Sequence, residues 1–428
     1  MKKQRRLPVE VNLALGFLCM ILLGALLLFL PISHQEGKTM SFIDSLFLAT
    51  SGVCVTGLTP VDISVTLSTF GSTVLMILFQ VGGLGYAVIA ALLLGLIHRG
   101  GSLTEHHMLF DSFGADNGIK FNTLLRFILA STFIIELVGT IILFFPFSQD
   151  YSAPRALYIA LFTSLAAFNN AGFDLFSTSM LGYNDNPLVL FTVAFLIIIG
   201  GIGYVLMMEV FIKIRRRGRL ALHSKIVLST TAVLLLGGAV LFYLTTDMDM
   251  KNAFFQSATT RTAGFFSYDQ MALSEPAIVL TILLMFIGAS PGSTGGGIKT
   301  TTFFVAVKGA FSLLRGKDAT AFRRKISDES MQKAFNFFSM ALVLLTVCLF
   351  LLCITDGELG IVRLLYEEVS AFATVGLTMG VTPNLSVPGK IIITALMYFG
   401  RVGILTLIAI FSSRRRRVSY IEGKVVIG

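Results

Sequence analysis

Long apolar runs alternate with shorter, mixed segments along almost the whole of this chain. The apolar runs lie near residues 11–31, 70–97, 122–146, 187–212, 225–245, 276–315, 333–355 and 387–412. A helix needs about 20 mainly apolar residues to cross the hydrocarbon core of a bilayer, which is about 30 Å thick. The pattern therefore predicts eight transmembrane helices, of which the sixth is interrupted.

A shorter and more polar helix is expected within each successive pair of apolar runs. The four candidates are Ser41–Val53, Pro154–Asn169, Lys251–Arg261 and Gly360–Ala373. They are too short to cross a bilayer, so we expect each of them to enter the membrane and turn back.

Each short helix ends in a turn that is centred on a glycine. The turns read "CVTGL", "NNAGF", "TTRTAGFF" and "ATVGL", and their glycines are Gly57, Gly172, Gly264 and Gly376. Successive glycines are 115, 92 and 112 residues apart, and a quarter of the 428-residue chain is 107. Four copies of one unit explain this spacing: a span, a half-helix, a glycine turn and a second span.

The predicted fold is an all-α polytopic membrane protein, with eight transmembrane helices and four re-entrant half-helices around one pore per protomer. The four repeats are expected at residues 1–100, 101–213, 214–316 and 317–413, followed by a cytoplasmic C-terminal tail at 414–428.

A cluster of small residues recurs in the second span of every repeat. The clusters read "QVGGLGY", "IIGGIGY", "FIGASPG" and "YFGRVGI", and their glycines Gly82, Gly200, Gly288 and Gly400 follow the turn glycines by 25, 28, 24 and 24 residues. In the first two repeats we interpret the cluster as close packing between helices. The last two depart from this pattern, one by a break in the helix and one by an arginine.

The break in the sixth run is "GASPGSTGGGIKTT", Gly288–Thr301, whose glycines and proline cannot sustain a helix. Irregular backbone at membrane depth is tolerated only where it lines a cavity or is buried in protein. Arg401 holds the matching place in the last repeat, where a structural ion pair is the alternative to a functional role. We expect the loop to accept hydrogen bonds from Arg401 and to form a gate with it below the turns. The expected gate residues are Gly288, Ser290, Gly292, Ser293, Thr294, Gly295, Gly296, Gly297, Lys299 and Arg401.

The composition agrees with a membrane protein. The chain is 55% hydrophobic and 13% charged, with a mean hydropathy of +0.83, whereas soluble domains carry about 25% charged residues. If the glycine turns face outward, the segments that face inward hold 25 of the 33 Lys and Arg. The positive-inside rule then predicts cytoplasmic N- and C-termini. The net charge of +9 is mostly a signal of topology, and nucleic-acid binding is disfavoured.

The four turns are the candidate ion site. A cation that crosses a membrane must replace its hydration shell, and backbone carbonyls that surround one axis can do so. Glycine tolerates the backbone angles that this arrangement requires. The alternative is that the turns are ordinary helix C-caps. The expected filter residues are Val55, Thr56, Gly57, Asn170, Ala171, Gly172, Thr262, Ala263, Gly264, Thr374, Val375 and Gly376.

Charged residues beside the turns are expected to support this site. Arg261 is expected to brace the third turn by bonding to outer acids, because a cation does not bind a cation. The acids expected on the outer side, where they would raise the local cation concentration, include Asp62, Asp174, Asp269, Glu367 and Glu368.

These residues resemble the Trk/Ktr/HKT potassium-transporter superfamily, and within it the KtrB-type membrane subunit of bacterial Ktr uptake systems. The resemblance covers nearly the whole chain and rests on the four turns, on "GASPGSTGGGIKTTTF", on "GRVGILT" and on the ending "EGKVVIG". It implies potassium transport across the bacterial cell membrane, with the loop and Arg401 as the gate. Unlike potassium channels, the chain has one glycine per turn and no repeated "GYG".

The resemblance also implies partners. These are a second copy of the chain in a homodimer and a cytosolic ring of KtrA-type nucleotide-binding regulatory subunits. The segment "RGKDATAFRRKISDESMQK" and the basic tail are candidate docking surfaces, with ordinary positive-inside loops as the alternative, and "YIEGKVVIG" is expected near the dimer interface. No organic cofactor is expected. K+ is the transported ion, and a coupling role for Na+ stays open.

Two other functional classes are alternatives to a Ktr-type potassium transporter. An autonomous Na+/K+ channel or transporter would share the same turns, and only flux measurements with competing cations separate it. An enzyme is disfavoured because no Ser/His/Asp or Cys/His set recurs at one membrane depth. "GSTGGGIKTT" fails the spacing of a phosphate-binding loop, because Ile298 separates Gly297 from Lys299.

Overall fold

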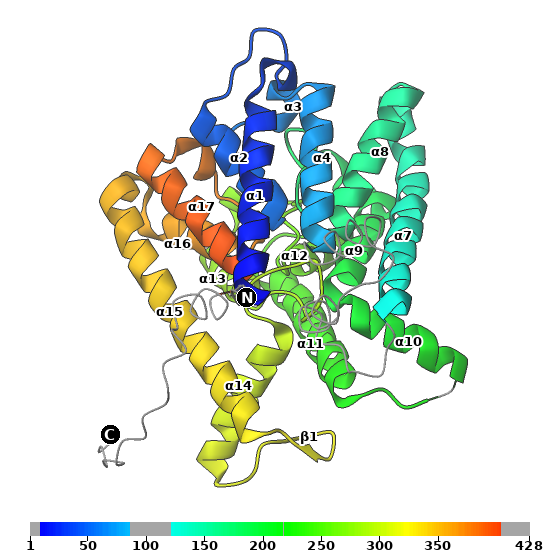
Figure 1. Ribbon diagram of the computed structural model, residues 1–428, viewed down its shortest axis with the longest axis vertical. Helices are drawn as coiled ribbons and strands as arrows, with labels where there is room; N and C mark the ends of the chain where they lie inside the picture. The colour runs from blue at the N-terminus through cyan, green and yellow to red at the C-terminus, as the bar shows by residue number, and fades with distance from the viewer. Residues whose placement is uncertain (1–8, 86–120, 217, 404–428) are drawn as a thin grey trace, which may run out of the picture.

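The computed structural model describes residues 9–85, 121–216 and 218–403, and this part of the chain is mainly helical (Figure 1). Its helices are α1 (Val9–Phe29), α2 (Phe42–Cys54), α3 (Ile63–Thr66), α4 (Thr69–Leu84), α7 (Phe121–Asp150), α8 (Ala153–Phe168), α9 (Pro187–Ile202), α10 (Tyr204–Arg216), α11 (Leu222–Thr245), α12 (Met250–Thr259), α13 (Glu275–Phe286), α14 (Thr300–Arg315), α15 (Asp328–Asp356), α16 (Ile361–Phe372) and α17 (Val387–Val402). Short 3-10 turns lie at η1 (Pro31–Ser33), η2 (Leu181–Tyr183), η3 (Gln270–Ala272), η4 (Gly357–Leu359) and η5 (Thr382–Asn384). Strands β1 (Thr320–Ala321) and β2 (Arg324–Lys325) form a small antiparallel hairpin.

Side-chain caps explain where several of these helices begin. Ser41 accepts a hydrogen bond from the Asp44 amide at the start of α2, and Asp249 accepts one from the Asn252 amide at the start of α12. A side-chain oxygen at this position satisfies a backbone N–H that has no partner within the helix. The four short helices predicted from the sequence correspond to α2, α8, α12 and α16, with bounds that differ by one or two residues.

Helix length separates the apolar helices into two groups. Within the described residues, three helical stretches are long and apolar enough to cross a membrane: Thr123–Asp150, Leu222–Thr245 and Asp328–Leu359. A fourth is obtained if α9 and α10 are counted as one span, although they meet at a bend of 96°. The prediction of one continuous helix over 187–212 is therefore wrong, because the helix breaks at Gly203, which has a φ of 92°.

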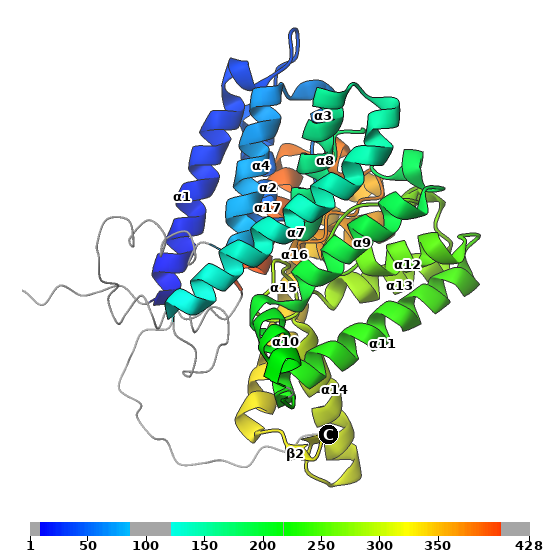
Figure 2. The same ribbon diagram turned by 90° about the vertical axis from the view of Figure 1, so that its right-hand side faces the viewer.

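The short helices are enclosed by the longer ones. Along the chain, α2 packs between α1 and α4, α8 between α7 and α9, and α16 between α15 and α17, whereas α12 packs between α9 and α11 (Figures 1 and 2). Further contacts join α4 to α8, α11 to α13, α13 to α16, and α17 back to α2. The short helices and their neighbours therefore form a closed ring.

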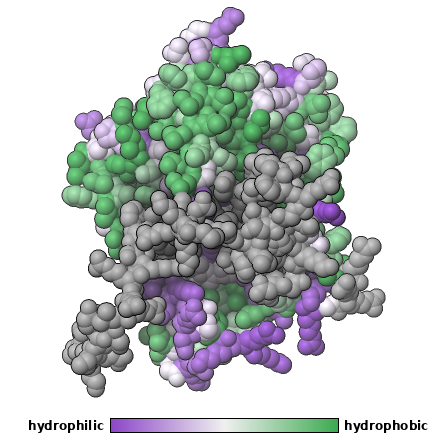
Figure 3. Space-filling model, viewed as in Figure 1, coloured by the Kyte–Doolittle hydropathy of each residue, from purple (hydrophilic) through white to green (hydrophobic). Residues whose placement is uncertain are grey.

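The outer surface of this ring is apolar. Leu23, Phe133, Leu244 and Phe350 on the long helices each expose more than half of their area. Figure 3 shows apolar surface over the upper helices, and hydrophilic surface at the bottom of the view, where α14 and the hairpin lie. This distribution fits helices that face lipid and a polar end that faces water.

Candidate functional site

The backbone takes the same unusual course after each short helix. A non-glycine residue with positive φ comes first, and the turn glycine, also with positive φ, follows two residues later. The pairs are Val55 (59°) and Gly57 (98°), Asn170 (58°) and Gly172 (68°), Thr262 (74°) and Gly264 (81°), and Thr374 (52°) and Gly376 (94°). Positive φ is strained for β-branched residues such as valine and threonine. Such strain persists only where the surrounding structure holds it in place, and it often marks a functional site.

The four turns meet one another in a closed ring. A Cβ atom added to Gly57 would lie 2.6 Å from the Ala171 carbonyl oxygen, and one added to Gly172 would lie 2.6 Å from the Ala263 oxygen. The ring closes because a Cβ on Gly264 would lie 2.5 Å from the Val375 oxygen, and one on Gly376 would overlap the Thr56 oxygen. Any side chain at these glycines would therefore push a neighbouring carbonyl out of place.

The amide groups of the turns are held by the short helices, and this leaves the carbonyls available. The Thr56 and Val375 amides each donate over 2.8 Å to a carbonyl of the preceding helix, and the Gly57 amide donates over 3.0 Å to the Ser51 hydroxyl. Among the hydrogen bonds of the described residues, none ends on a carbonyl of the filter residues. The structure thus brings all four predicted turns together.

The loop between α13 and α14 lies against the turns. A Cβ added to Gly295 would collide with the Thr262 hydroxyl, and one added to Gly296 would collide with the Thr374 hydroxyl. The Lys299 ammonium donates over 2.6 Å to the Gly295 carbonyl, so a charged side chain holds the loop closed upon itself. The loop therefore packs directly behind the first residues of two turns.

The loop is also attached to the bend between α9 and α10. The Ser290 amide donates over 3.0 Å to the Gly201 carbonyl, and the Tyr204 amide donates over 3.0 Å to the Gly292 carbonyl. Close packing at the first two glycine clusters is real, since Gly82 and Gly200 lie against carbonyls of Val53 and Phe168. The clusters also end their helices, which the packing interpretation did not predict.

Arg401, in the last turn of α17, makes the contact expected of it. Its guanidinium donates to the Thr294 carbonyl in the loop and to the Gly82 carbonyl at the end of α4. Neither partner is a carboxylate, so this arginine joins backbone to backbone. It links the loop to two different parts of the helix ring.

Two expectations about charged residues are wrong. Arg261 does not reach an outer acid, because its side chain turns to α11, where it donates to the Thr231 carbonyl over 3.2 Å and to the Thr231 hydroxyl over 3.3 Å. Glu367 and Glu368 are buried in α16 and do not line an outer surface. Glu367 accepts a hydrogen bond from the Thr378 hydroxyl over 2.6 Å, and the Glu368 carboxylate has no hydrogen-bond partner among the described residues.

Of the acids that were expected on the outer side, Asp174 lies in the loop that follows the second turn. Burial is the main cause that raises its pKa to about 6, and the neighbouring Asp62 carboxylate raises this pKa further. A hydrogen bond of 2.8 Å from the Phe176 amide opposes both effects. Asp174 therefore gains or loses its charge at a mildly acidic pH.

A buried polar group beside the second turn was missed at the level of sequence. The Glu136 carboxylate of α7 accepts hydrogen bonds from Gln80 over 2.9 and 3.1 Å and from Asn169 over 3.1 Å. Asn169 immediately precedes Asn170 of the turn. The signal was available, because Glu136 is a lone acid within the apolar run 122–146, and ionisable residues within membrane helices are rare and often functional.

Comparisons with known proteins agree with this architecture. A family model described as "TrkH: Cation transport protein" matches residues 16–417. The Ktr system potassium uptake protein B of Vibrio alginolyticus is 39% identical over 407 residues, which is 92% of this chain and 89% of that protein. The protein of the same name from Bacillus subtilis is 37% identical over 438 residues, which is 98% of this chain and 97% of that protein.

Two further matches extend the comparison. The potassium/sodium uptake protein NtpJ of Enterococcus hirae is 35% identical over 445 residues, which is 100% of this chain and 98% of that protein. The crystal structure of the potassium transporter TrkH from Vibrio parahaemolyticus superposes with a TM-score of 0.74 at 19% identity, covering 96% of this chain and 86% of that chain. That structure supports the fold alone. The family match and the identities together show that the chain belongs to the TrkH family of cation transport proteins, which are membrane transporters and not enzymes.

Proposed function

We propose that this chain is the potassium-translocating membrane subunit of a Ktr-type uptake system. The proposal rests on one observation above all: four turns with the same unusual backbone close a ring whose carbonyls are not used by other hydrogen bonds. Two relatives of similar length are named as Ktr system potassium uptake proteins, which supports K+ as the ion. The proposed architecture is four span–pore-helix–span units around one pore.

The ring would act as a selectivity filter. The carbonyls of Val55, Thr56, Asn170, Ala171, Thr262, Ala263, Thr374 and Val375 would replace the hydration shell of K+ as it enters. Each short helix points its C-terminal end at the turn, and the partial negative charge of a helix C-terminus favours a cation there. Glycine at the third position of each turn leaves room for the neighbouring carbonyl.

The loop and Arg401 would act as the gate. The loop packs behind Thr262 and Thr374, and Arg401 ties it to the end of α4. A fixed positive charge in a pore of low dielectric repels an approaching cation. Opening would require the loop to leave the Arg401 guanidinium, which donates to the Thr294 carbonyl, and the bend at Gly203, which holds the loop through backbone hydrogen bonds.

The orientation follows from charge. The polar end with α14 and the β1–β2 hairpin carries a dense group of Lys and Arg residues and would face the cytoplasm, as would both termini. A small apolar cluster of Ile226, Ala319, Ala321 and Ile326 holds the hairpin against α11. The hairpin is therefore a fixed feature of this end of the molecule.

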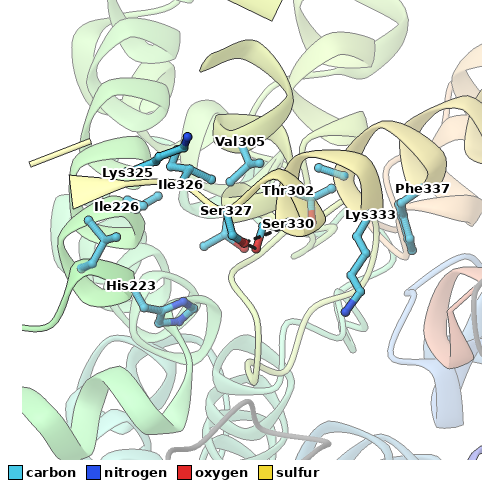
Figure 4. A pocket seen from close by; sticks show the side chains of 13 residues that line it. His223, Ile226, Thr302, Val305, Lys325, Ile326, Ser327, Ser330, Lys333 and Phe337 are labelled. Atoms are coloured by element: carbon cyan, nitrogen blue, oxygen red, sulfur yellow. Dashed lines mark hydrogen bonds between the residues drawn. The ribbon is translucent and has the colours of Figure 1, made fainter. Parts of the chain in front are cut away.

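This end would receive the cytosolic KtrA-type regulatory ring. A pocket of about 560 Å³ opens between α11, α14 and α15, and its lining includes residues of the segment "RGKDATAFRRKISDESMQK" (Figure 4). The lysines beside it are paired with acids, Lys325 with Asp318 over 2.8 Å and Lys333 with Glu329 over 2.6 Å. The first turns of α14 line this pocket, and α14 begins directly after the loop, so a partner bound here could move the gate.

The direct experiment is potassium uptake in a bacterium that lacks its own potassium transporters, with and without a regulatory subunit and with Na+ present or absent. We expect K+ uptake that increases with the regulatory subunit and exceeds Na+ uptake. Equal uptake of both ions without any subunit would favour an autonomous Na+/K+ transporter, to which the name of the Enterococcus relative draws attention. No cation uptake by a correctly inserted chain would overturn the proposal.

A further inference from the structure

An apolar cleft lies on the outside of the helix ring, away from the turns. It has a volume of about 920 Å³ and lies between α7, α9, α10 and α11. This is at the upper end of the range of ligand pockets, about 300–1,000 Å³. Its lining is aliphatic and aromatic, and several of these residues, such as Ile134, Phe211 and Ile214, expose more than half of their area. The cleft therefore opens onto the apolar outer surface.

Of the described residues that line the cleft, the charged one is Lys213 near the end of α10. Among the described residues, no carboxylate forms a salt bridge with its ammonium group. Glu209, one helical turn earlier, is engaged elsewhere, because its carboxylate accepts a hydrogen bond of 2.7 Å from the Ala221 amide and another from the Ser224 hydroxyl. Arg126 and Arg219 are exposed and adjoin residues of the lining in sequence.

The position of α10 explains why charge and apolar surface meet here. The helix leaves α9 at an angle of 96° and runs across the molecule instead of along α9 (Figures 1 and 2). Its sequence "YVLMMEVFIKIRR" places apolar residues before a basic end. A helix of this kind lies in the membrane interface, with its apolar side toward the acyl chains and its basic residues toward the headgroups.

We propose that this cleft binds an anionic phospholipid, with an acyl chain in the apolar cavity and the phosphate beside Lys213. The charge complementarity favours this occupant, since the described part of the lining has a basic residue and no acid. If the basic end of the protein faces the cytoplasm, as proposed above, the lipid comes from the cytoplasmic leaflet. Lipid binding in the cleft does not depend on which ion the protein transports.

A lipid in the cleft would brace the bend between α9 and α10. Ile199 and Ile202 line the cleft before Gly203, and Met207 and Val210 line it after Gly203, so one acyl chain would contact both sides of the bend. On its other side the bend is held by the loop, for example through the bond from the Tyr204 amide to the Gly292 carbonyl, so lipid would support the side that faces the cleft. Bound lipid should therefore raise the thermal stability of the protein.

The test uses the purified full-length protein in detergent, with 1-palmitoyl-2-oleoyl phosphatidylglycerol as the probe and phosphatidylcholine of the same chains as the neutral comparison. Native mass spectrometry measures lipid retention, and a thermal-shift measurement gives the change in Tm. Lys213→Ala should weaken phosphatidylglycerol binding about fivefold, because one basic residue near a membrane surface contributes about 1 kcal/mol, and it should leave phosphatidylcholine binding unchanged. Ala130→Phe, which fills the cleft, should reduce retention of both lipids.

Two control variants separate the effect of the charge at Lys213 from a general effect of basic residues on lipid binding. Lys308→Ala removes a charge from exposed α14, away from the cleft, and should bind lipid as the unaltered protein does. Lys213→Arg should restore phosphatidylglycerol binding if the charge itself is what matters. Equal retention of both lipids by the unaltered protein, or an equal loss in Lys308→Ala, would overturn the proposal. So would unchanged lipid binding in Ala130→Phe, since the cleft would then have another occupant, such as a second copy or another part of the chain.

Discussion

At the scale of single residues, the turn glycines combine two requirements that no residue type other than glycine meets. Their φ angles are positive, and a neighbouring carbonyl lies where a Cβ atom would be. Gly37 offers a natural comparison, because its φ is also positive, at 75°, but no atom lies within 4 Å of its added Cβ. The two requirements can therefore be separated by experiment.

We predict that Gly57→Ser lowers the preference of the transporter for K+ over Na+ by about tenfold, which corresponds to roughly 1.4 kcal/mol. The serine Cβ would displace the Ala171 carbonyl from the ring. Gly37→Ser should cost about 1–2 kcal/mol of backbone strain at its own site and leave the ion preference unchanged. Competition between Na+ and Rb+ in uptake assays measures the effect. An unaltered preference in serine variants of all four turn glycines would show that the turns are not the filter.

Asp174 predicts a dependence of uptake on external pH. Its pKa is raised to about 6, so the carboxylate is charged above that pH and neutral below it. Acidification from pH 7.5 to 5 should therefore lower the apparent affinity for K+, by at most about fivefold, because a unit charge in water contributes about 1 kcal/mol at 4 Å. Asp174→Asn should have the low affinity at every pH, whereas Asp269→Asn should keep the dependence. A pH profile that Asp174→Asn leaves intact would assign the effect to another group.

At the scale of elements, the bounds of the four predicted short helices agree with the structure because their signals are local. Ser41 and Asp249 begin helices through their own side chains, and after each helix a non-glycine residue with positive φ, such as Val55 or Thr262, turns the chain two residues before the glycine. The bend at Gly203 was missed because "IIGGIGY" has the same composition as a packing motif within a straight helix. The loop 288–297, which lies about 90 residues further along the chain, forms hydrogen bonds with the bend, and this contact is not visible in the local sequence.

The loop and Arg401 yield a prediction about flux. Arg401→Ala, or shortening of Ser290–Gly296, should raise K+ flux about tenfold, which requires a barrier lower by only about 1.4 kcal/mol. Flux should also become less dependent on the regulatory subunit. Arg401→Lys keeps the charge but cannot span both the Thr294 and Gly82 carbonyls, so an intermediate flux is expected. Loss of uptake in the alanine variant and in the shortened loop, with both proteins folded and in the membrane, would assign the loop a supporting role instead.

At the scale of the whole molecule, the ring could be predicted from four evenly spaced glycines, but its supporting charges could not. The direction of the Arg261 side chain and the burial of Glu367 and Glu368 depend on which helices pack behind each turn, and this information is not local. For Glu136 the residue itself could be found from the sequence, because it is a lone acid in an apolar run. Its hydrogen-bond partners Gln80 and Asn169 are identified only by the structure.

Assembly is a prediction of the same scale. The purified chain should be a dimer, and deletion of Tyr420–Gly428, which lies outside the described residues, should weaken the dimer or its coupling to the regulatory ring. Light scattering after size-exclusion chromatography measures the first effect, and nucleotide-regulated uptake measures the second. An unaltered dimer with normally regulated uptake would show that the tail is needed neither for dimerisation nor for regulation.

The central claim is that K+ passes through the ring formed by the four turns, and a bound ion tests it most directly. Crystals of the protein grown with Tl+ in place of K+ would locate the ion by its anomalous scattering. The account predicts a peak on the axis of the ring, within coordination distance of the carbonyls of Thr56, Ala171, Ala263 and Val375, and a weaker peak in Gly57→Ser. An anomalous peak elsewhere in the molecule, with none at the ring, would contradict it.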